Sequence, residues 1–92
     1  MQFNWNADKN AWLRKERGIS FEEILSRMED GHLLDVVDHP HQERYPGQRF
    51  LVVDVNDYCY LVPFVLSGDE CFLKTIIPSR KFTRLYKKGV GK

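Results

Sequence analysis

The chain has 92 residues, a length that fits one domain with one modest hydrophobic core. Its composition is 42% hydrophobic and 29% charged, which is typical of a globular protein and excludes a disordered or low-complexity chain. No apolar run reaches the roughly 18–20 residues that a membrane-spanning helix needs. The first residues lack the pattern of a secretory signal, and two cysteines are too few for a disulfide scaffold. We therefore expect a single cytoplasmic domain over residues 1–92, with reduced thiols and no membrane contact.

The net charge is +1, but the charges are unevenly distributed along the chain. Residues 19–43 hold seven acidic side chains and one basic side chain, Arg27. Residues 71–92 hold seven basic side chains and no acidic one. Such a basic segment favours binding to phosphate backbones or to an acidic partner. The plainer alternative is a solvated basic end that pairs with the acidic segment of the same chain.

Helix signals dominate the first third of the chain. Residues 2–5 alternate and predict a short strand, after which Asn6 can cap a helix over residues 7–17 that ends at a glycine. Ser20 and Glu23 form a capping-box pattern, and the apolar residues that follow recur at helical spacing. We therefore expect two consecutive helices here.

Strand signals dominate the middle of the chain. Four β-rich runs are separated by one loop and two tight turns, which predicts consecutive hairpins; the runs cover residues 33–38, 49–55, 58–66 and 70–77. Pro63 lies inside the third run, and because proline cannot donate to a ladder, we expect a bulge or an unpaired edge there. Pro78 is expected to end the fourth strand.

The final helix is predicted over residues 80–88, with Ser79 as its cap. Phe82, Leu85 and Tyr86 recur at helical spacing and would dock on the sheet, which would leave the basic side chains facing outward. The element order is therefore β-α-α-β-β-β-β-α. It predicts an α+β fold, a small antiparallel β-meander sheet with two N-terminal helices and one C-terminal helix packed against it.

Metal and nucleotide chemistry have no support in the motifs. His32, His39 and His41 lack the ligand spacing of zinc sites, while Cys59 and Cys71 fall in different strands and fit a core. The sequence also contains no glycine-rich phosphate loop and no nucleophile elbow. We expect no metal site and no cofactor.

RNA cleavage requires neither a metal nor a cofactor, because the ribose 2′-hydroxyl supplies the nucleophile. It requires groups that take and return a proton, and cations that stabilise the charge of the transition state. Arg49 and Arg80 suit the phosphate contact, since a guanidinium pairs two phosphate oxygens and stays ionised. We expect these two arginines to converge on one phosphodiester. Tyr86, His41 and Glu43 are the candidates for proton transfer.

Each of these residues also has a structural interpretation. Arg49 can pair with a carboxylate at a sheet edge, Tyr86 can belong to the core, and His41 can simply be exposed in its loop. Other basic side chains in the last third of the chain are candidates for RNA binding: Lys74, Lys81, Arg84, Lys87 and Lys88.

Several stretches, taken in order, resemble the BrnT family of type II toxins. Residues 3–9 and residues 17–23 (RGISFEE) are similar to that family's opening phrases F-x-W-D-x-x-K and K-H-G-V-S-F-E-E. Arg49-Phe50 resembles its strand start E-x-R-F, and residues 76–84 (IIPSRKFTR) resemble its stretch I-I-S-A-R-x-A-T-x. Together the stretches span nearly the whole chain.

The resemblance implies a RelE-like fold and a metal-independent endoribonuclease toxin that inhibits translation. It also implies a cognate antitoxin that binds DNA and forms a hetero-oligomer with the toxin. Arg49 and Arg80 are the matched positions, and the resemblance implies phosphate binding for both. Leu13 and Arg17 stand where the family usually has Asn and His, and Tyr86 stands where it commonly carries a Glu. The alternative is therefore a non-catalytic module of the same fold that binds RNA, the ribosome or a protein.

Overall fold

The computed structural model describes residues 1–87, which form an α+β fold. The elements in chain order are β1 (Gln2–Asn4), α1 (Ala7–Arg17), α2 (Phe21–Glu29), β2 (Leu33–Asp38), β3 (Arg49–Val55), β4 (Tyr58–Ser67), β5 (Glu70–Leu73), β6 (Ile77–Pro78) and α3 (Arg80–Lys87). The strands form one sheet in the order β1-β5-β4-β3-β2, and β6 pairs with β4. β1 and β5 are parallel, and the other pairings are antiparallel. The predicted fold class and element order are confirmed.

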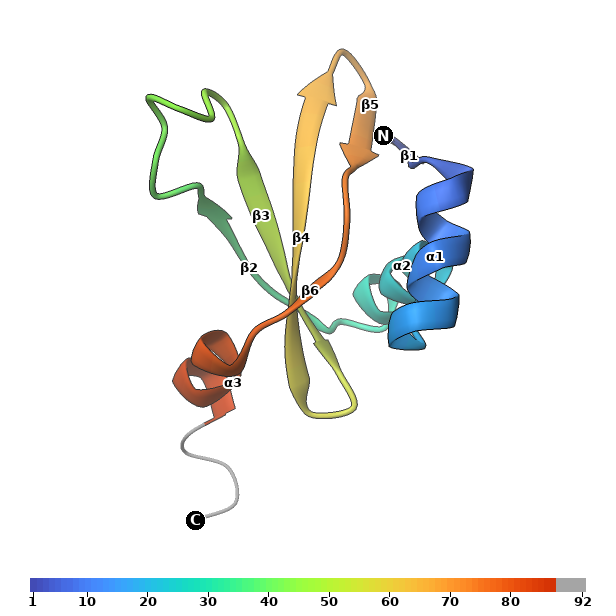
Figure 1. Cartoon of the computed structure of the whole chain (residues 1–92). Coiled ribbons are helices and arrows are strands. Elements are labelled where there is room, and N and C mark those ends of the chain that lie inside the picture. Colours follow the sequence, from blue (N-terminus) through green and yellow to red (C-terminus); the bar gives the residue numbers. More distant parts are fainter. Residues whose placement is uncertain (88–92) are drawn as a thin grey trace.

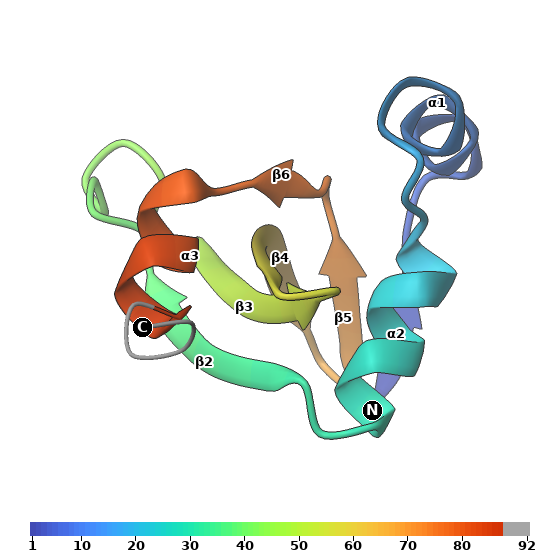
Figure 2. The same ribbon diagram turned by 90° about the horizontal axis from the view of Figure 1, so that it is seen from below.

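The helices cover opposite faces of the sheet. Figures 1 and 2 show α1 and α2 together on one side and α3 on the other. Alternate side chains of β3 explain this arrangement, because successive residues of a strand point to opposite faces. Leu51 and Val53 join the main core with Phe21 and Ile24 of α2. Asp54, between Val53 and Val55, instead bonds to Lys87 of α3.

Local capping explains where the first two helices begin. The side chain of Asn6 accepts a hydrogen bond from Lys9 N at 2.8 Å, and the hydroxyl of Ser20 accepts one from Glu23 N at 3.1 Å. Gly18 ends α1 in the left-handed conformation, with φ at 67°, as its position predicts. The buried Asn10 then joins the helices, because its Oδ1 accepts from Phe21 N at 2.8 Å.

The last β-rich run is two strands rather than one. β5 ends at Leu73, which pairs with Phe64, whereas β6 places Ile77 opposite Leu61. Three residue steps along β4, from 64 to 61, therefore face four steps along the segment from β5 to β6, from 73 to 77. This segment thus holds one extra residue, as in a β-bulge. Pro63 lies at this point, where the sequence predicts a bulge, and its carbonyl still accepts from Lys74 N at 2.8 Å. Pro78 pairs with Tyr60 as the last residue of β6, so the strand ends at this proline as predicted.

Helix α3 docks through different side chains from those predicted. Ser79 caps it, accepting from Phe82 N at 3.1 Å, and Phe82 and Tyr86 are half-buried as expected. Leu85, however, is 58% exposed, so its predicted docking is wrong. Thr83 docks instead, because its hydroxyl accepts from Cys59 N at 2.8 Å. Since eight residues make little more than two turns, the contact rests on these few side chains.

Candidate nucleic-acid interface

A cleft of about 340 Å³ lies between the sheet, α3 and the loop that joins β2 to β3. Strands β2, β3 and β4, the start of the loop and helix α3 all contribute to its walls. The residues that line it are Val37, Asp38, His39, Pro40, Phe50, Leu61, Lys81 and Phe82. Phe50 and Phe82 supply aromatic rings, and Lys81 supplies a cation. A space that combines aromatic rings with a cation can accept an unstacked base and its phosphate.

The loop that forms one wall of the cleft is held by a single glutamine. Gln42 Nε2 donates to His39 O at 2.9 Å and to Gln48 O at 3.0 Å, while its Oε1 accepts from Gly47 N at 3.1 Å. The backbone of His39 is also fixed, because its N donates to Gln48 O at 2.9 Å. These bonds across the base of the loop hold His39 beside the sheet.

His39 is surrounded by aromatic rings and held in one tautomer. Its ring centroid lies 4.3 Å from that of Tyr45 and 5.2 Å from that of Phe50. Its Nδ1 accepts a hydrogen bond from His41 N at 3.0 Å, so the neutral imidazole carries its proton on Nε2. Because Nδ1 is occupied by the backbone of His41, His39 offers a ligand its Nε2 proton and its ring face.

The structure does not support the expected convergence of Arg49 and Arg80 on one phosphodiester, because their backbones lie toward different faces of the sheet. Arg49 lies opposite Phe64, on the sheet face that α1 and α2 cover, and its guanidinium lies 5.7 Å from that ring. Ser79 N donates to Cys59 O at 3.0 Å, so α3 starts level with Cys59, and Phe82 of α3 lines the cleft with Phe50 on the other face. The five steps of β4 between residues 59 and 64 correspond to about 17 Å.

Arg49 pairs with a carboxylate, which is the structural role that the sequence offered as the alternative to phosphate binding. Its Nε lies 3.5 Å from Asp38 Oδ1, a carboxylate of the neighbouring strand β2. The side chain is 43% exposed, and Asp38 is 76% exposed, so the pair is a surface ion pair of small energetic value. A cation that already has a carboxylate partner is a poorer phosphate ligand than one without.

The predicted RNA-binding residues divide into two groups. Arg80, Lys81 and Arg84 are exposed along α3, and Lys74 is exposed after β5. The prediction that Lys87 faces outward is wrong, because its Nζ lies 2.9 Å from Asp54 Oδ2 and 3.6 Å from Asp57 Oδ1. These carboxylates raise the pKa of Lys87, chiefly through the hydrogen bond to Asp54.

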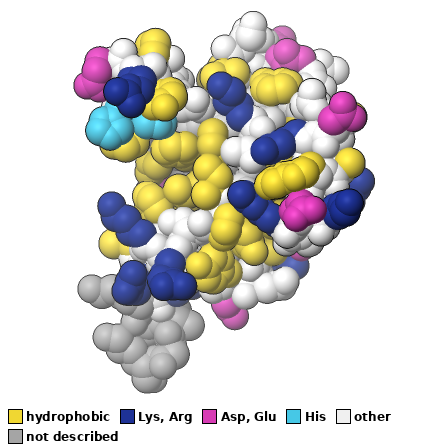
Figure 3. Space-filling model, in the orientation of Figure 1, with side chains coloured by type: hydrophobic (Ala, Val, Ile, Leu, Met, Phe, Trp, Pro, Cys, Tyr) yellow, Lys and Arg dark blue, Asp and Glu magenta, His cyan; other side chains and the backbone are white. Residues whose placement is uncertain are grey.

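The Lys87 contact anchors α3, and Lys88 lies outside the described residues. In Figure 3, Lys and Arg side chains gather over the α3 region, and hydrophobic side chains separate them from the histidines above. The cations and the apolar surface therefore lie on the same face of the molecule.

Tyr86 is engaged in a hydrogen bond that makes it a poor proton-transfer group. Its hydroxyl donates to Asp35 Oδ2 at 2.5 Å, which joins α3 to β2. This bond is the main cause that raises the pKa of Tyr86 to about 12, and the same bond lowers the pKa of Asp35. At neutral pH the phenol is protonated and its proton is held by a carboxylate. Proton transfer by Tyr86, as the sequence predicts it, has no support in this geometry.

The Tyr86–Asp35 bond predicts a pH-dependent effect of Tyr86→Phe. Because the pKa of Asp35 is lowered in the folded protein, its stabilising effect is present above about pH 4 and is lost as the pH falls through the lowered value. Because the pKa of Tyr86 is raised, its effect is present below about pH 10 and is lost as the pH rises towards about 12. Tyr86→Phe should therefore lower the melting temperature at pH 7, and the difference from the original protein should become smaller as the pH falls below about 4. A difference that stays constant over this range would contradict this assignment.

His41 lies in a second, smaller pocket, at the outer side of the loop. This pocket of about 180 Å³ is lined by His41, Glu43 and Arg44. The three side chains are exposed and bring an imidazole, a carboxylate and a guanidinium together. They are the residue types that proton transfer and phosphate binding need, in a loop that adjoins the cleft.

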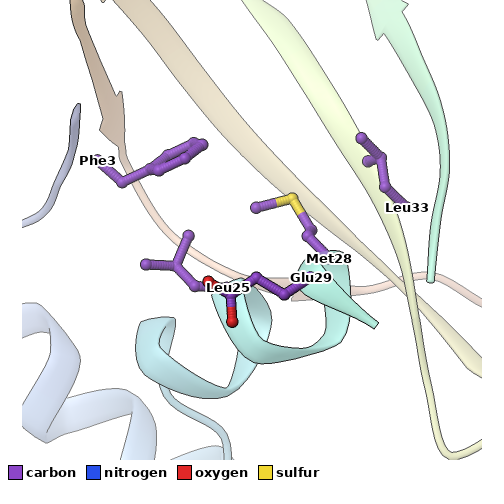
Figure 4. Close-up of a pocket in the computed structure, with 5 residues that line it drawn as sticks. All are labelled: Phe3, Leu25, Met28, Glu29 and Leu33. Atoms are coloured by element: carbon purple, nitrogen blue, oxygen red, sulfur yellow. The ribbon is translucent and has the colours of Figure 1, made fainter. Parts of the chain in front are cut away.

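The pocket beside α2 has the wrong chemistry for RNA. Figure 4 shows its residues, which come from β1, α2 and the start of β2, and its volume is about 290 Å³. Phe3, Leu25, Met28 and Leu33 make it apolar, and Glu29 is its charged residue. Among the described residues, no cation lines this pocket to offset Glu29, whereas the cleft at α3 holds Lys81 as well as Asp38, so the α3 face is the better candidate interface.

Comparison with models of protein families, with curated proteins and with solved structures found no match. Within residues 1–87, no helix is long and apolar enough to cross a membrane. The same residues contain no group of three or more side chains that could hold a metal ion. Cys59 and Cys71 are both buried and unpaired, and burial raises the pKa of each thiol. The fold and the site thus define a small α+β protein with a cationic, aromatic cleft.

Aromatic residues of the cleft are the part of the candidate site that sequence reasoning missed. Phe50 and Phe82 both fit an apolar pattern, which is why they were expected to pack rather than to line a cleft. The alternation of side chains along a strand could have placed Phe50 on the same sheet face as Leu61 and Val37, the face that lines the cleft. No sequence signal indicates that the 39–48 loop covers them.

Proposed function

We propose that this protein binds single-stranded RNA across the face that carries α3. A base would enter the cleft against Phe50 and Phe82, and Lys81 would contact the adjoining phosphate. Arg80 and Arg84, which are exposed on the same helix, would bind flanking phosphates. The cleft carries the proposal, because it joins aromatic surface and cationic charge at one place.

Binding has more support than cleavage at this cleft. A nuclease centre needs a group that is ready to take a proton and one that is ready to return it. The Tyr86 hydroxyl donates its proton to Asp35. Nδ1 of His39, the nitrogen that would have to take a proton, already accepts a hydrogen bond from the backbone of His41. Arg49 belongs to the opposite face. The features that remain are those of a binding surface.

A metal-independent endoribonuclease toxin is the second candidate, and the pocket of His41, Glu43 and Arg44 favours it. RNA held in the cleft would pass this loop, because His39 of the cleft and His41 of the pocket lie in contact, with ring centroids 5.9 Å apart. His41 and Glu43 would then share the proton transfers, and Arg44 would stabilise the phosphate charge. This assignment keeps the toxin that the BrnT resemblance implies but moves its centre away from Arg49 and Arg80.

A cognate antitoxin would fit either candidate. The exposed cations of α3 suit an acidic partner segment as well as they suit RNA. A partner on this face would cover the cleft and exclude RNA from it. In the toxin–antitoxin setting, neutralisation would therefore be competition for one surface.

One assay on the purified protein separates the two candidates. Fluorescently labelled single-stranded RNA is titrated with protein in EDTA, and the same samples are analysed for 2′,3′-cyclic phosphate ends. We expect salt-sensitive binding without cleavage, and we expect Lys81→Ala to weaken binding and to reduce the salt slope by about 0.7. Arg27→Ala is the matched control, because it removes one cation from α2, where Arg27 pairs with Glu23 on the opposite side of the sheet from α3, and it should leave the affinity within about two-fold.

Absence of binding at low salt, or an equal loss in both variants, would contradict an interface at α3. Cleavage that persists in Lys81→Ala but disappears in His41→Ala would replace the binding module by the nuclease candidate.

A further inference from the structure

Trp12 is a large aromatic side chain that the core does not use. It lies on α1, whose buried residues are Asn10 and Leu13, and it is 43% exposed. Trp5 behaves in the opposite way, because it stacks on Phe21 at 5.4 Å and packs against the main core. An exposed indole contributes little to folding but offers a wide stacking surface to a ligand.

Two cations lie over the Trp12 ring. Lys9 Nζ lies 4.5 Å from the ring centroid, and the guanidinium carbon of Arg17 lies 5.2 Å from it. A base would stack on the indole in place of the flexible Lys9 side chain, whose ammonium group would then contact the phosphate. The Lys9–Trp12–Arg17 cluster thus has the same chemistry as the cleft at α3.

Arg17 also connects this cluster to the segment that leads to α3. Its Nη1 donates to Ile76 O at 2.5 Å, just before β6 begins. Ile77 is 38% exposed, Pro78 is exposed, and α3 starts at Arg80. Four extended residues from Ile76 to Arg80 span about 13 Å, a short distance for a polynucleotide.

The figures place these elements on one side of the molecule. In Figure 1, β6 crosses in front of the sheet between α1 and α3, and in Figure 2 α1 and β6 lie along the same edge. In Figure 3, Lys and Arg side chains are visible over both the α1 and the α3 regions of this face, with hydrophobic side chains between them. A strand of RNA could therefore contact both regions without passing around the protein.

We propose that the Lys9–Trp12–Arg17 cluster is a second base-stacking site, which an RNA strand reaches from the α3 cleft by crossing β6. This inference rests on the proposed binding of RNA at α3 and extends it. It identifies the ligand as a single strand long enough to cover both sites, and it predicts that affinity depends on length.

The test compares oligouridines of about 4 and about 12 nucleotides, which bracket the occupation of one site and of both. Trp12→Ala should weaken binding of the longer RNA by about ten-fold or more and leave the shorter RNA unchanged. Trp12→Phe should retain most of the affinity, because it keeps a stacking ring. In Trp5→Phe, where Trp12 is the remaining tryptophan, the longer RNA should quench the fluorescence and the shorter one should not.

The outcomes separate this inference from the proposed function. If Lys81→Ala weakens both RNAs while Trp12→Ala weakens neither, the second site does not exist and the α3 interface stands. If the original protein binds neither RNA at low salt, both proposals are wrong. A loss in Trp12→Ala that Trp12→Phe does not restore, with an altered circular dichroism spectrum, would show a structural role and would also overturn the second site.

Discussion

Phe21→Ala is expected to lower the free energy of unfolding by about 3–5 kcal/mol, the range for deleting a buried aromatic ring. Phe21 is 0% exposed and stacks on Trp5, with ring centroids 5.4 Å apart. Its backbone N also donates to Asn10, so it lies where α1, α2 and the sheet meet. Small domains have a total stability of about 5–15 kcal/mol, and the loss would thus be a large part of it. Urea denaturation followed by circular dichroism measures the change.

Leu85→Ala is the matched control for this prediction. It also removes a large apolar side chain, but Leu85 is 58% exposed on α3. We expect a change within about 0.5 kcal/mol. A loss of less than about 1 kcal/mol in Phe21→Ala would contradict the central position of this ring in the core.

Removing the three exposed cations of α3 is expected to lower RNA affinity by about 100-fold at low salt and to reduce the salt slope by about 2. The variant combines Arg80→Ala, Lys81→Ala and Arg84→Ala. The effect is large because each contact with a phosphate releases counterions, and these three contacts adjoin the cleft. Fluorescence anisotropy over a series of salt concentrations measures both quantities.

The control is a second triple variant, which loses the same net charge at three cations away from α3. Arg14, Lys15 and Arg27 lie on α1 and α2, and Arg14 and Arg27 lie 2.9 and 3.6 Å from carboxylates of Glu22 and Glu23. Their combined replacement by alanine should change affinity only through the general charge of the protein. If both triple variants lose affinity equally, RNA is attracted by overall charge, and no defined interface exists at α3.

Local signals explain how much of the fold could be predicted from the sequence. Asn6, Ser20 and Ser79 accept the capping bonds that their positions predict. Short turns between the β-rich runs correctly predict the antiparallel hairpins of β3, β4 and β5. Caps and hairpins depend on residues that are close together in the sequence, and for this reason they can be predicted from one sequence.

The errors concern contacts between distant residues. The sequence pairs Arg49 with Arg80 because both are arginines at strand ends, yet a strand alternates faces, and α3 covers the face that Phe50 shares. Lys87 has the pattern of a solvent-facing residue, but Asp54 of β3 holds it against the sheet. Asp54 itself sits in an apolar run, where nothing local indicates a partner 33 positions away. Side-chain parity and the choice of helix face are tertiary properties.

The candidate site is a mixture of both cases. Lys81 and Arg84 are found correctly as exposed cations, because charge runs usually remain in solvent. The cleft beside them requires the loop of residues 39–48, whose shape depends on the side chain of Gln42. No spacing rule predicts that a glutamine orders a loop and thereby places His39 against Phe50.

Ultraviolet crosslinking of 4-thiouridine RNA, with the attachment sites mapped by mass spectrometry, tests most directly whether RNA lies across the α3 face. Crosslinks should occur in α3 and in the loop of residues 39–48, at Phe82, His39 or their neighbours. Crosslinks confined to α2 and to Leu33 at the start of β2, beside Glu29, would contradict the account. So would bound RNA whose crosslinks are the same in the Arg80, Lys81 and Arg84 triple variant.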